Sequence, residues 1–261
     1  MPALSLGRRH SRDRLCRYAF RMCNRYRPAS TTFIRDALGW TLIEESYPAS
    51  IGPLQPGPFI VPGRAIVGQW GLIPWGSKTR KPTRSDGKPM STNNCRRETV
   101  ATAWSFRGPW SRGQRCLIPA LDYDEPYWGT GKNIWWRFAR ADRQPWALAG
   151  IWSEWTDPAT GEVVPCYTML TQNCDAHPLL NQFHKPDPKL PADKQDKRSV
   201  APIERENWHQ WLHGSIEEAS DLIQLPAREL FAHGAAEPSQ QMELAGQAQL
   251  QAGMNGLPSA T

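Results

Sequence analysis

The stretch RCLIPALDYDEPYW spans residues 115–128 and combines an apolar run with a cluster of carboxylates. A short apolar run bounded by polar and turn-forming residues is typical of a buried strand. We therefore predict a strand here that delivers a carboxylate to its end. Because side chains alternate between the two faces of a strand, we expect Asp124 and Glu125 to point in opposite directions.

The segments that follow this strand predict more β-structure. Apolar and polar residues alternate over residues 134–138, residues 141–144 are typical of a turn, and residues 146–152 are again largely apolar. This pattern predicts a hairpin over residues 133–155. Another strand is expected over residues 163–173.

Helical patterns are few. Ser30 is followed by two threonines and an apolar face, which predicts a capped helix ending near Gly39. Shorter helical patterns cover residues 204–211 and 216–222. Residues 47–75 read as short strands between prolines, and residues 91–104 end in a short helical pattern.

The overall composition favours short strands and loops over long helices. The chain of 261 residues contains 24 prolines, which interrupt helices. Hydrophobic residues make up 39% of the chain, enough for a core, but no apolar run approaches the length of a bilayer span. We therefore expect a folded protein that is not inserted in a membrane.

The cysteines and the charge constrain the function. Six cysteines form no CxxC pair and no zinc-type spacing with histidine, so neither a metal nor a cofactor is expected. Free thiols fit a reducing cytoplasm best. A net charge of +6 favours an anionic partner such as nucleic acid, with a merely basic enzyme as the alternative. Residues 76–90 form a polar loop with five basic residues, among them Lys78 and Arg80, which suits contact with phosphates.

The chain has a second potential start inside its first thirty residues. Residues 1–21 are rich in arginine and lack the apolar segment of a secretory signal. They are followed by Met22-Cys23-Asn24-Arg25-Tyr26, which resembles a translation start. We expect residues 1–21 to be a mis-assigned start or a removed extension, residues 22–235 to form a single domain, and residues 236–261 to be a disordered tail.

Four stretches together resemble the SOS-response-associated peptidase (SRAP) family. They are residues 22–26, 70–75 (WGLIPW), 94–99 (NCRRET) and 115–125. The resemblance implies an α+β domain with a β-barrel-like core of short strands, flanking helices and a basic groove for single-stranded DNA. It also implies capture of abasic sites through the N-terminal cysteine as a covalent thiazolidine crosslink, which shields the lesion in the DNA-damage response. An autopeptidase activity that exposes this cysteine is a further implication, which places the chain among hydrolase- or lyase-like enzymes.

The resemblance implies roles for four residues. Cys23 would supply an α-amine and a thiol, both partly nucleophilic near neutral pH. Asn94 would hold the amine and the sugar oxygens. The adjacent residue, Asn93, is also an asparagine and is the alternative match. Glu125 would transfer protons, since apolar walls raise the pKa of a carboxyl. A neutral histidine would shuttle a proton during Schiff-base formation, and His184 is the better match, with His177 as the alternative. In shorter family members an arginine follows this histidine closely. Here an insert separates His184 from the corresponding candidate, Arg198.

The DNA contacts are expected from basic and aromatic residues. Arg25, Arg96 and Arg198 are candidates for phosphate contacts. Trp70 and Trp75 are candidates for a wedge or stacking surface beside the lesion, unless they belong to the core.

Two other functions remain open from the sequence. Cys23, His184 and Asn94 have the residue types of a cysteine peptidase acting on peptides. A non-covalent reader of modified DNA is the third hypothesis. In all three cases we expect a monomer in the cytoplasm, associated with the nucleoid when it is engaged on DNA.

Overall fold

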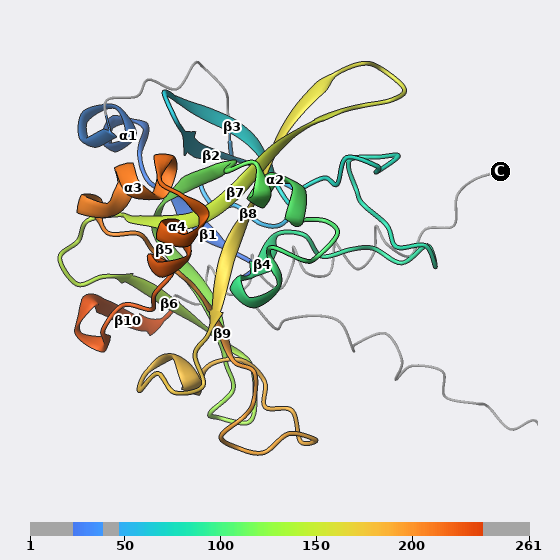
Figure 1. Cartoon of the computed structure of the whole chain (residues 1–261). Helices are drawn as coiled ribbons and strands as arrows, with labels where there is room; N and C mark the ends of the chain where they lie inside the picture. Colours follow the sequence, from blue (N-terminus) through green and yellow to red (C-terminus); the bar gives the residue numbers. More distant parts are fainter. Residues whose placement is uncertain (1–22, 39–46, 237–261) are drawn as a thin grey trace, which may run out of the picture.

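The computed structural model describes residues 23–38 and 47–236 (Figure 1). The predicted N-terminal extension, Met22, and the predicted tail from residue 237 onward lie outside the described residues. The described part is a mixed α and β structure in which ten strands form one continuous hydrogen-bonded sheet.

Five strands close into a barrel. They are β2 (Pro56–Val61), β3 (Arg64–Trp70), β5 (Arg115–Tyr127), β7 (Trp146–Thr156) and β8 (Val163–Asn173). Strand β2 pairs with β3 and β5, β7 pairs with β5 and β8, and a parallel pairing of β3 with β8 completes the ring. The expected α+β class with a barrel-like core is confirmed. Strands β5, β7 and β8 are 11 to 13 residues long, however, and are not the short strands expected from the prolines.

Strand β5 continues beyond the barrel and collects further strands. Its first half pairs with β7, and its second half pairs with β6 (Ile134–Arg140) and with β1 (Tyr26–Pro28). Both strands of the predicted hairpin exist, but β6 and β7 pair with successive parts of β5 and not with each other. The hairpin prediction was therefore wrong, because alternation locates strands but carries no information about their partners.

The remaining strands lie at the margins of the sheet. Strand β10 (Phe231–Ala235) pairs with β6. Strand β4 (Asn94–Arg96) runs parallel to the second half of β8, and β9 (Arg198–Val200) runs antiparallel to the same part of β8. Strands β4 and β9 thus bring residues from two distant segments of the chain to one region of the sheet.

Helices are short and lie outside the barrel (Figure 1). Helix α1 (Thr31–Leu38) begins as predicted, because the Ser30 hydroxyl accepts a hydrogen bond from the Phe33 amide at 3.1 Å. The other described helices are α2 (Arg107–Ser111), α3 (Trp208–His213) and α4 (Ile216–Asp221), with short 3₁₀ turns η1 (Arg97–Thr99), η2 (Leu180–Gln182), η3 (Arg205–Asn207) and η4 (Arg228–Leu230). Within the described residues no helix is long and apolar enough to cross a membrane.

Two apolar clusters occupy the two faces of the sheet. Phe59 and Ile118 belong to one cluster, whereas their neighbours Ile60 and Leu117 belong to the other. This alternation is what a strand buried on both faces requires. The second cluster includes Trp211 and attaches α3 and α4 to the barrel. These two helices therefore lie on the other face of the sheet from the cluster that contains Cys23.

A substitution at Gly68 tests how the barrel closes. It lies in β3 next to the parallel pairing with β8, and a Cβ at this position would come within 2.5 Å of the Pro165 carbonyl oxygen. We expect Gly68→Ala to lower the free energy of unfolding by about 1–3 kcal/mol, the usual cost of overpacking, as measured by urea denaturation.

Gly234→Ala is the matched control for this substitution. Gly234 also lies in a strand, β10, but a Cβ there would meet nothing within 4 Å. If Gly68→Ala were as stable as Gly234→Ala, the close approach of β3 to β8 would not be what closes the barrel.

Candidate active site

Cys23 lies three residues before the start of β1 and is held from two sides. Its side chain is buried, and its thiol faces the Arg25 carbonyl oxygen at 3.5 Å. Its own carbonyl oxygen accepts a hydrogen bond of 2.6 Å from the Asn94 amide. Burial raises the pKa of the Cys23 thiol well above its ordinary value, and the negative charge of Glu125 raises it further. The thiol is therefore kept protonated in the free protein.

Asn93 and Asn94 both contact Cys23, but only the Asn94 side chain has a polar atom that forms no hydrogen bond with a described residue. The Asn93 amide lies 3.4 Å from the Cys23 carbonyl oxygen, donates to the Asn24 side chain, and accepts from the Ser91 hydroxyl. The carbonyl oxygen of the Asn94 side chain is buried and has no partner among the described residues. Asn94 is thus the residue that can bind an additional group beside Cys23.

Glu125 is buried near the end of β5. Neither of its carboxyl oxygens forms a hydrogen bond within the described part of the chain. Burial and the negative charge of Asp124 raise the pKa of Glu125 well above its ordinary value. Asp124 itself points to the other face, where Arg137 donates two hydrogen bonds to its carboxylate at 3.0 and 3.2 Å. The expected alternation of these two residues is confirmed.

His184 faces Glu125 from a different segment of the chain. Its Nε2 lies 3.5 Å from the Glu125 carboxyl and donates to the Arg198 carbonyl oxygen at 2.7 Å. Its backbone amide donates to the Pro126 carbonyl oxygen at 2.7 Å, which ties His184 to the residue after Glu125. The backbone of His184 has φ +65°, a left-handed conformation that non-glycine residues adopt mainly where the surroundings impose it.

The protonation states of this pair follow from burial. Burial lowers the pKa of His184 to about 4 and so favours the neutral imidazole at neutral pH. Since Nε2 donates to a carbonyl, the buried Nδ1 carries the lone pair, and no described residue donates to it. A buried carboxyl with a raised pKa thus faces a neutral imidazole and lies near the Cys23 thiol, which is a suitable set for proton transfer at a covalent bond.

His177 has a structural role. Its Nε2 lies 2.8 Å from the Pro226 carbonyl oxygen, and its Nδ1 accepts hydrogen bonds from the amides of Leu179 and Leu180. Both ring nitrogens are therefore engaged. Of the two histidines considered, only His184 lies beside Glu125.

The residues expected to contact DNA are distributed between core and surface. Trp70 is fully buried and donates to the Asn93 carbonyl oxygen at 2.8 Å, so it occupies a core position and not the stacking surface expected for it. Arg25 is 4% exposed and donates to the Ser50 hydroxyl. Trp75, in contrast, is 87% exposed, so its indole is available for stacking.

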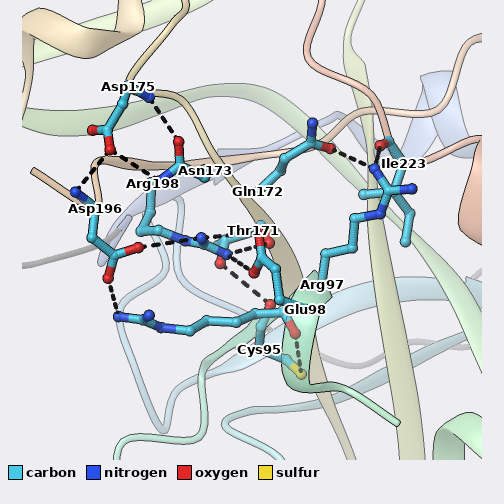
Figure 2. A network of polar contacts seen from close by, with 11 residues as sticks. Cys95, Arg97, Glu98, Thr171, Gln172, Asn173, Asp175, Asp196, Arg198 and Ile223 are labelled. Carbon is cyan, nitrogen blue, oxygen red and sulfur yellow. Dashed lines mark hydrogen bonds and ion pairs between the residues drawn. The ribbon is translucent and has the colours of Figure 1, made fainter. Parts of the chain in front are cut away.

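Arg96 and Arg198 belong to a network that the sequence did not reveal (Figure 2). The Arg198 guanidinium is 3% exposed and bonds to Glu98 at 2.5 and 3.1 Å. Asp196 lies between the two arginines, 2.7 Å from Arg96 and 3.4 Å from Arg198. Asp196 and Glu98 were missed because their contacts join segments that are 100 residues apart. For Asp196 the signal was the charged composition of the insert after His184, and for Glu98 it was its place in the stretch 94–99.

The described residues contain no group of three or more histidine, cysteine, aspartate or glutamate side chains placed to hold a metal ion. The side chains gathered around Cys23 carry nucleophilic and proton-transferring groups. Groups of these types are able to take part in proton transfer and in covalent bond formation with an electrophile.

Comparison with known proteins places these observations in a family. A family model described as SOS response associated peptidase (SRAP) matches residues 22–237. The chain is 28% identical over 185 residues to abasic site processing protein HMCES of Gallus gallus, covering 63% of this chain and 50% of that protein. It is 25% identical over 191 residues to the protein of the same name from Pongo abelii, covering 59% and 48%. The chain thus spans about half the length of the curated relatives it matches.

Two solved structures are similar in fold. A crystal structure of a protein from Bordetella bronchiseptica has a TM-score of 0.72 at 31% identity, covering 82% of this chain and 100% of that chain. A protein from Bacteroides thetaiotaomicron has a TM-score of 0.67 at 20% identity, covering 84% and 94%. The second likeness concerns the fold alone.

The buried Glu125 predicts an unusual dependence of stability on pH. A raised pKa means that the folded protein holds this proton more tightly than the unfolded chain. That advantage is fully present below the unfolded pKa of about 4.3 and is lost as the pH rises through the folded-state pKa. Glu125→Gln removes the titration, so the variant should gain stability relative to wild type as the pH rises from about 5 to about 9. Urea denaturation across this range measures the gain.

Glu98→Gln serves as the control for this measurement. Burial opposes ionisation of Glu98, but its hydrogen bonds and the charge of Arg198 lower its pKa overall. Its titration therefore ends below about pH 5, and its stability difference from wild type should stay flat above that pH. A flat difference for Glu125→Gln as well would contradict a raised pKa of Glu125.

Proposed function

Because this chain belongs to the SOS response associated peptidase family, we propose that it senses abasic sites in single-stranded DNA and binds them covalently through Cys23. The observation that carries the proposal is the position of Cys23. Asn94 donates a hydrogen bond to its backbone carbonyl oxygen, and Glu125 lies close enough to influence its thiol. The relatives named abasic site processing protein support the choice of lesion.

The proposed reaction is the condensation of an amino thiol with an aldehyde. The α-amine of Cys23 attacks the open-chain aldehyde of the sugar and forms a carbinolamine. Loss of water gives an iminium ion, and the thiol sulfur then adds to the same carbon and closes a five-membered thiazolidine ring. One water molecule is released overall, and no oxidant or reductant is required.

Glu125 and His184 have complementary roles in this scheme. Part of the α-amine is unprotonated near neutral pH, and the neutral imidazole of His184 takes up the proton that this nitrogen loses after it has added to the aldehyde carbon, when the nitrogen is strongly acidic. The protonated Glu125 donates a proton to the departing hydroxyl group, becomes a carboxylate, and then accepts the proton of the thiol as sulfur adds. A carboxyl with a raised pKa suits both steps, because it is a weaker acid but a stronger base than an exposed glutamate.

The reaction requires a free amine on Cys23. In the printed chain this nitrogen forms a peptide bond to Met22, and an amide nitrogen cannot form a Schiff base with an aldehyde. We propose that translation from Met22 followed by removal of the methionine, or cleavage by the protein itself, exposes the amine. The autopeptidase step would leave Cys23 as the first residue.

The surface charge fits a DNA partner. The five basic residues of the loop over residues 76–90 lie near the exposed Trp75 in sequence, which is the combination used to bind single strands. We propose that this loop contacts the strand next to the lesion. The protein would act as a monomer in the cytoplasm, associated with the nucleoid when bound to DNA.

The peptidase alternative is less well supported as an activity on other proteins. A cysteine protease needs a thiolate, and its nucleophile has a lowered pKa. Burial instead raises the pKa of Cys23, and its thiol contacts a backbone carbonyl. A non-covalent reader would retain its full binding without Cys23, which the next experiment tests.

We expect protein expressed from Met22 to form an adduct with a single-stranded oligonucleotide that carries one abasic site. The adduct should survive boiling and appear as a shifted band on a denaturing gel. Cys23→Ala should abolish the band, because it removes the sulfur that closes the ring. Cys166→Ala is the matched control, since Cys166 is an equally buried thiol in β8, outside the candidate site.

Acetylation of the α-amine separates the hypotheses further. It should prevent the adduct while leaving an internal cysteine protease active. An adduct that forms with Cys23→Ala, or with the blocked amine, would refute the proposed chemistry. Reversible binding with no adduct on a confirmed free N-terminus would favour the non-covalent reader.

Glu125→Gln should slow adduct formation by about 10²–10⁴-fold, the usual contribution of a general acid–base group. Affinity for undamaged single strands should change little, because the buried carboxyl is not expected to contact the DNA backbone. Single-turnover gels and fluorescence anisotropy measure the two quantities. An unchanged rate would remove Glu125 from the mechanism.

A further inference from the structure

Four charged side chains form a row of ion pairs, of which Figure 2 labels Asp196, Arg198 and Glu98. In order they are Arg96, Asp196, Arg198 and Glu98, and each contacts the next. Arg198 also donates to the Thr171 carbonyl oxygen at 3.0 Å. The row joins β4 and η1 to the end of the insert that follows His184.

Asp196 is held in place by its backbone. Its φ is +54°, a left-handed conformation that aspartate tolerates better than most residues. The Asp175 carboxylate accepts hydrogen bonds from the amides of Asp196 and Lys197 at 2.9 and 2.8 Å. These contacts fix the backbone at Asp196, and the ion pairs with Arg96 and Arg198 hold its side chain between the two arginines.

The Asp196 carboxylate contacts Arg96 and Arg198 in the way that a bound phosphate would. Guanidinium groups bind carboxylates and phosphates with the same donor geometry. The Arg96 side chain is 43% exposed and that of Asp196 is 35% exposed, whereas Arg198 beneath them is 3% exposed. Asp196 and Glu98, which is 49% exposed, are therefore the outer carboxylates on Arg198, and of these two Asp196 is the one that also contacts Arg96.

The position of this row matches a strand entering the candidate site. Arg96 lies two residues after Asn94 in β4, and residues at this spacing share a face of a strand. The Arg198 carbonyl oxygen accepts the hydrogen bond of His184. A backbone phosphate next to a sugar bound at Cys23 would thus arrive close to these arginines.

We propose that Asp196 mimics a phosphate and must be displaced from Arg96 and Arg198 when a DNA strand binds. This inference rests on the proposed function, since it assigns a backbone phosphate of single-stranded DNA to the arginines. The two arginines and the two carboxylates of the row cancel in charge. A phosphate gains attraction there only when the Asp196 carboxylate moves away, so Asp196 lowers the non-covalent affinity for single strands.

The test is the affinity of Asp196→Asn for undamaged single-stranded DNA. Asparagine keeps the shape of the side chain and tolerates the same backbone conformation. We expect Kd to fall about fivefold at low salt, the scale of one contact between unit charges at a surface. The slope of log Kd against log salt should steepen by about 0.7, the value for one additional phosphate contact on a single strand. Fluorescence anisotropy of a labelled oligonucleotide measures both.

Asp193→Asn is the matched control. It removes the same charge from the same insert, but Asp193 is exposed and forms no ion pair among the described residues. Its Kd should stay within about twofold of wild type. The gain from Asp196→Asn should also disappear in an Arg96→Gln background, because the phosphate would then lose one of its two partners.

Three results would overturn the proposal. They are an unchanged Kd for Asp196→Asn, an equal gain for Asp193→Asn, and a gain that persists without Arg96. Adduct formation on abasic DNA, measured in parallel, keeps this test separate from the proposed function. Adducts with no effect of Asp196→Asn would refute only the phosphate mimic, whereas tighter binding without adducts would refute only the covalent reaction.

Discussion

Strand β5 must satisfy hydrogen bonds with four other strands along its thirteen residues, and the rest of the structure is arranged around this requirement. Its first half belongs to the closed barrel, where no edge is left open. Its second half leaves the barrel and pairs with β1 and β6. This places Glu125 beside the chain segment that begins with Cys23. The Pro126 carbonyl oxygen then positions His184, so one strand brings together three segments that are far apart in the sequence.

The candidate site contains polar groups that a purely structural core would not tolerate. Buried polar atoms are nearly always hydrogen-bonded, because an unpaired one costs about 1–3 kcal/mol. Yet both oxygens of Glu125, Nδ1 of His184 and the side-chain oxygen of Asn94 lack partners among the described residues. Such groups are expected where a substrate supplies the missing partners. The burial of apolar side chains in the two clusters of the sheet offsets the cost of these unpaired groups.

Much of the secondary structure could be predicted from the sequence, but the pairing of strands could not. The cap at Ser30 and strand β5 follow from local chemistry and periodicity. The parallel pairing of β3 with β8, and the division of β5 between β6 and β7, depend on contacts between distant segments that carry no local signal.

The same limit applies to the candidate site. Alternation predicted that Asp124 turns away from Glu125, and the contacts with Arg137 confirm it. The sequence could not show that Trp70 is buried and Trp75 exposed, because both are tryptophans in one apolar segment. The place of Asp196 between two arginines depends on an insert whose composition indicates only a charged loop.

In the proposed reaction the sugar of an abasic site becomes attached to both the nitrogen and the sulfur of Cys23. Mass spectrometry of the adduct, after digestion with nuclease and protease, would locate both bonds. We expect a modified peptide that begins at Cys23. Its mass should equal that of the peptide plus the sugar remnant minus one water, with neither a free amine nor a free thiol on this residue. A remnant on a lysine, or a modified peptide that still carries residues before Cys23, would contradict the account.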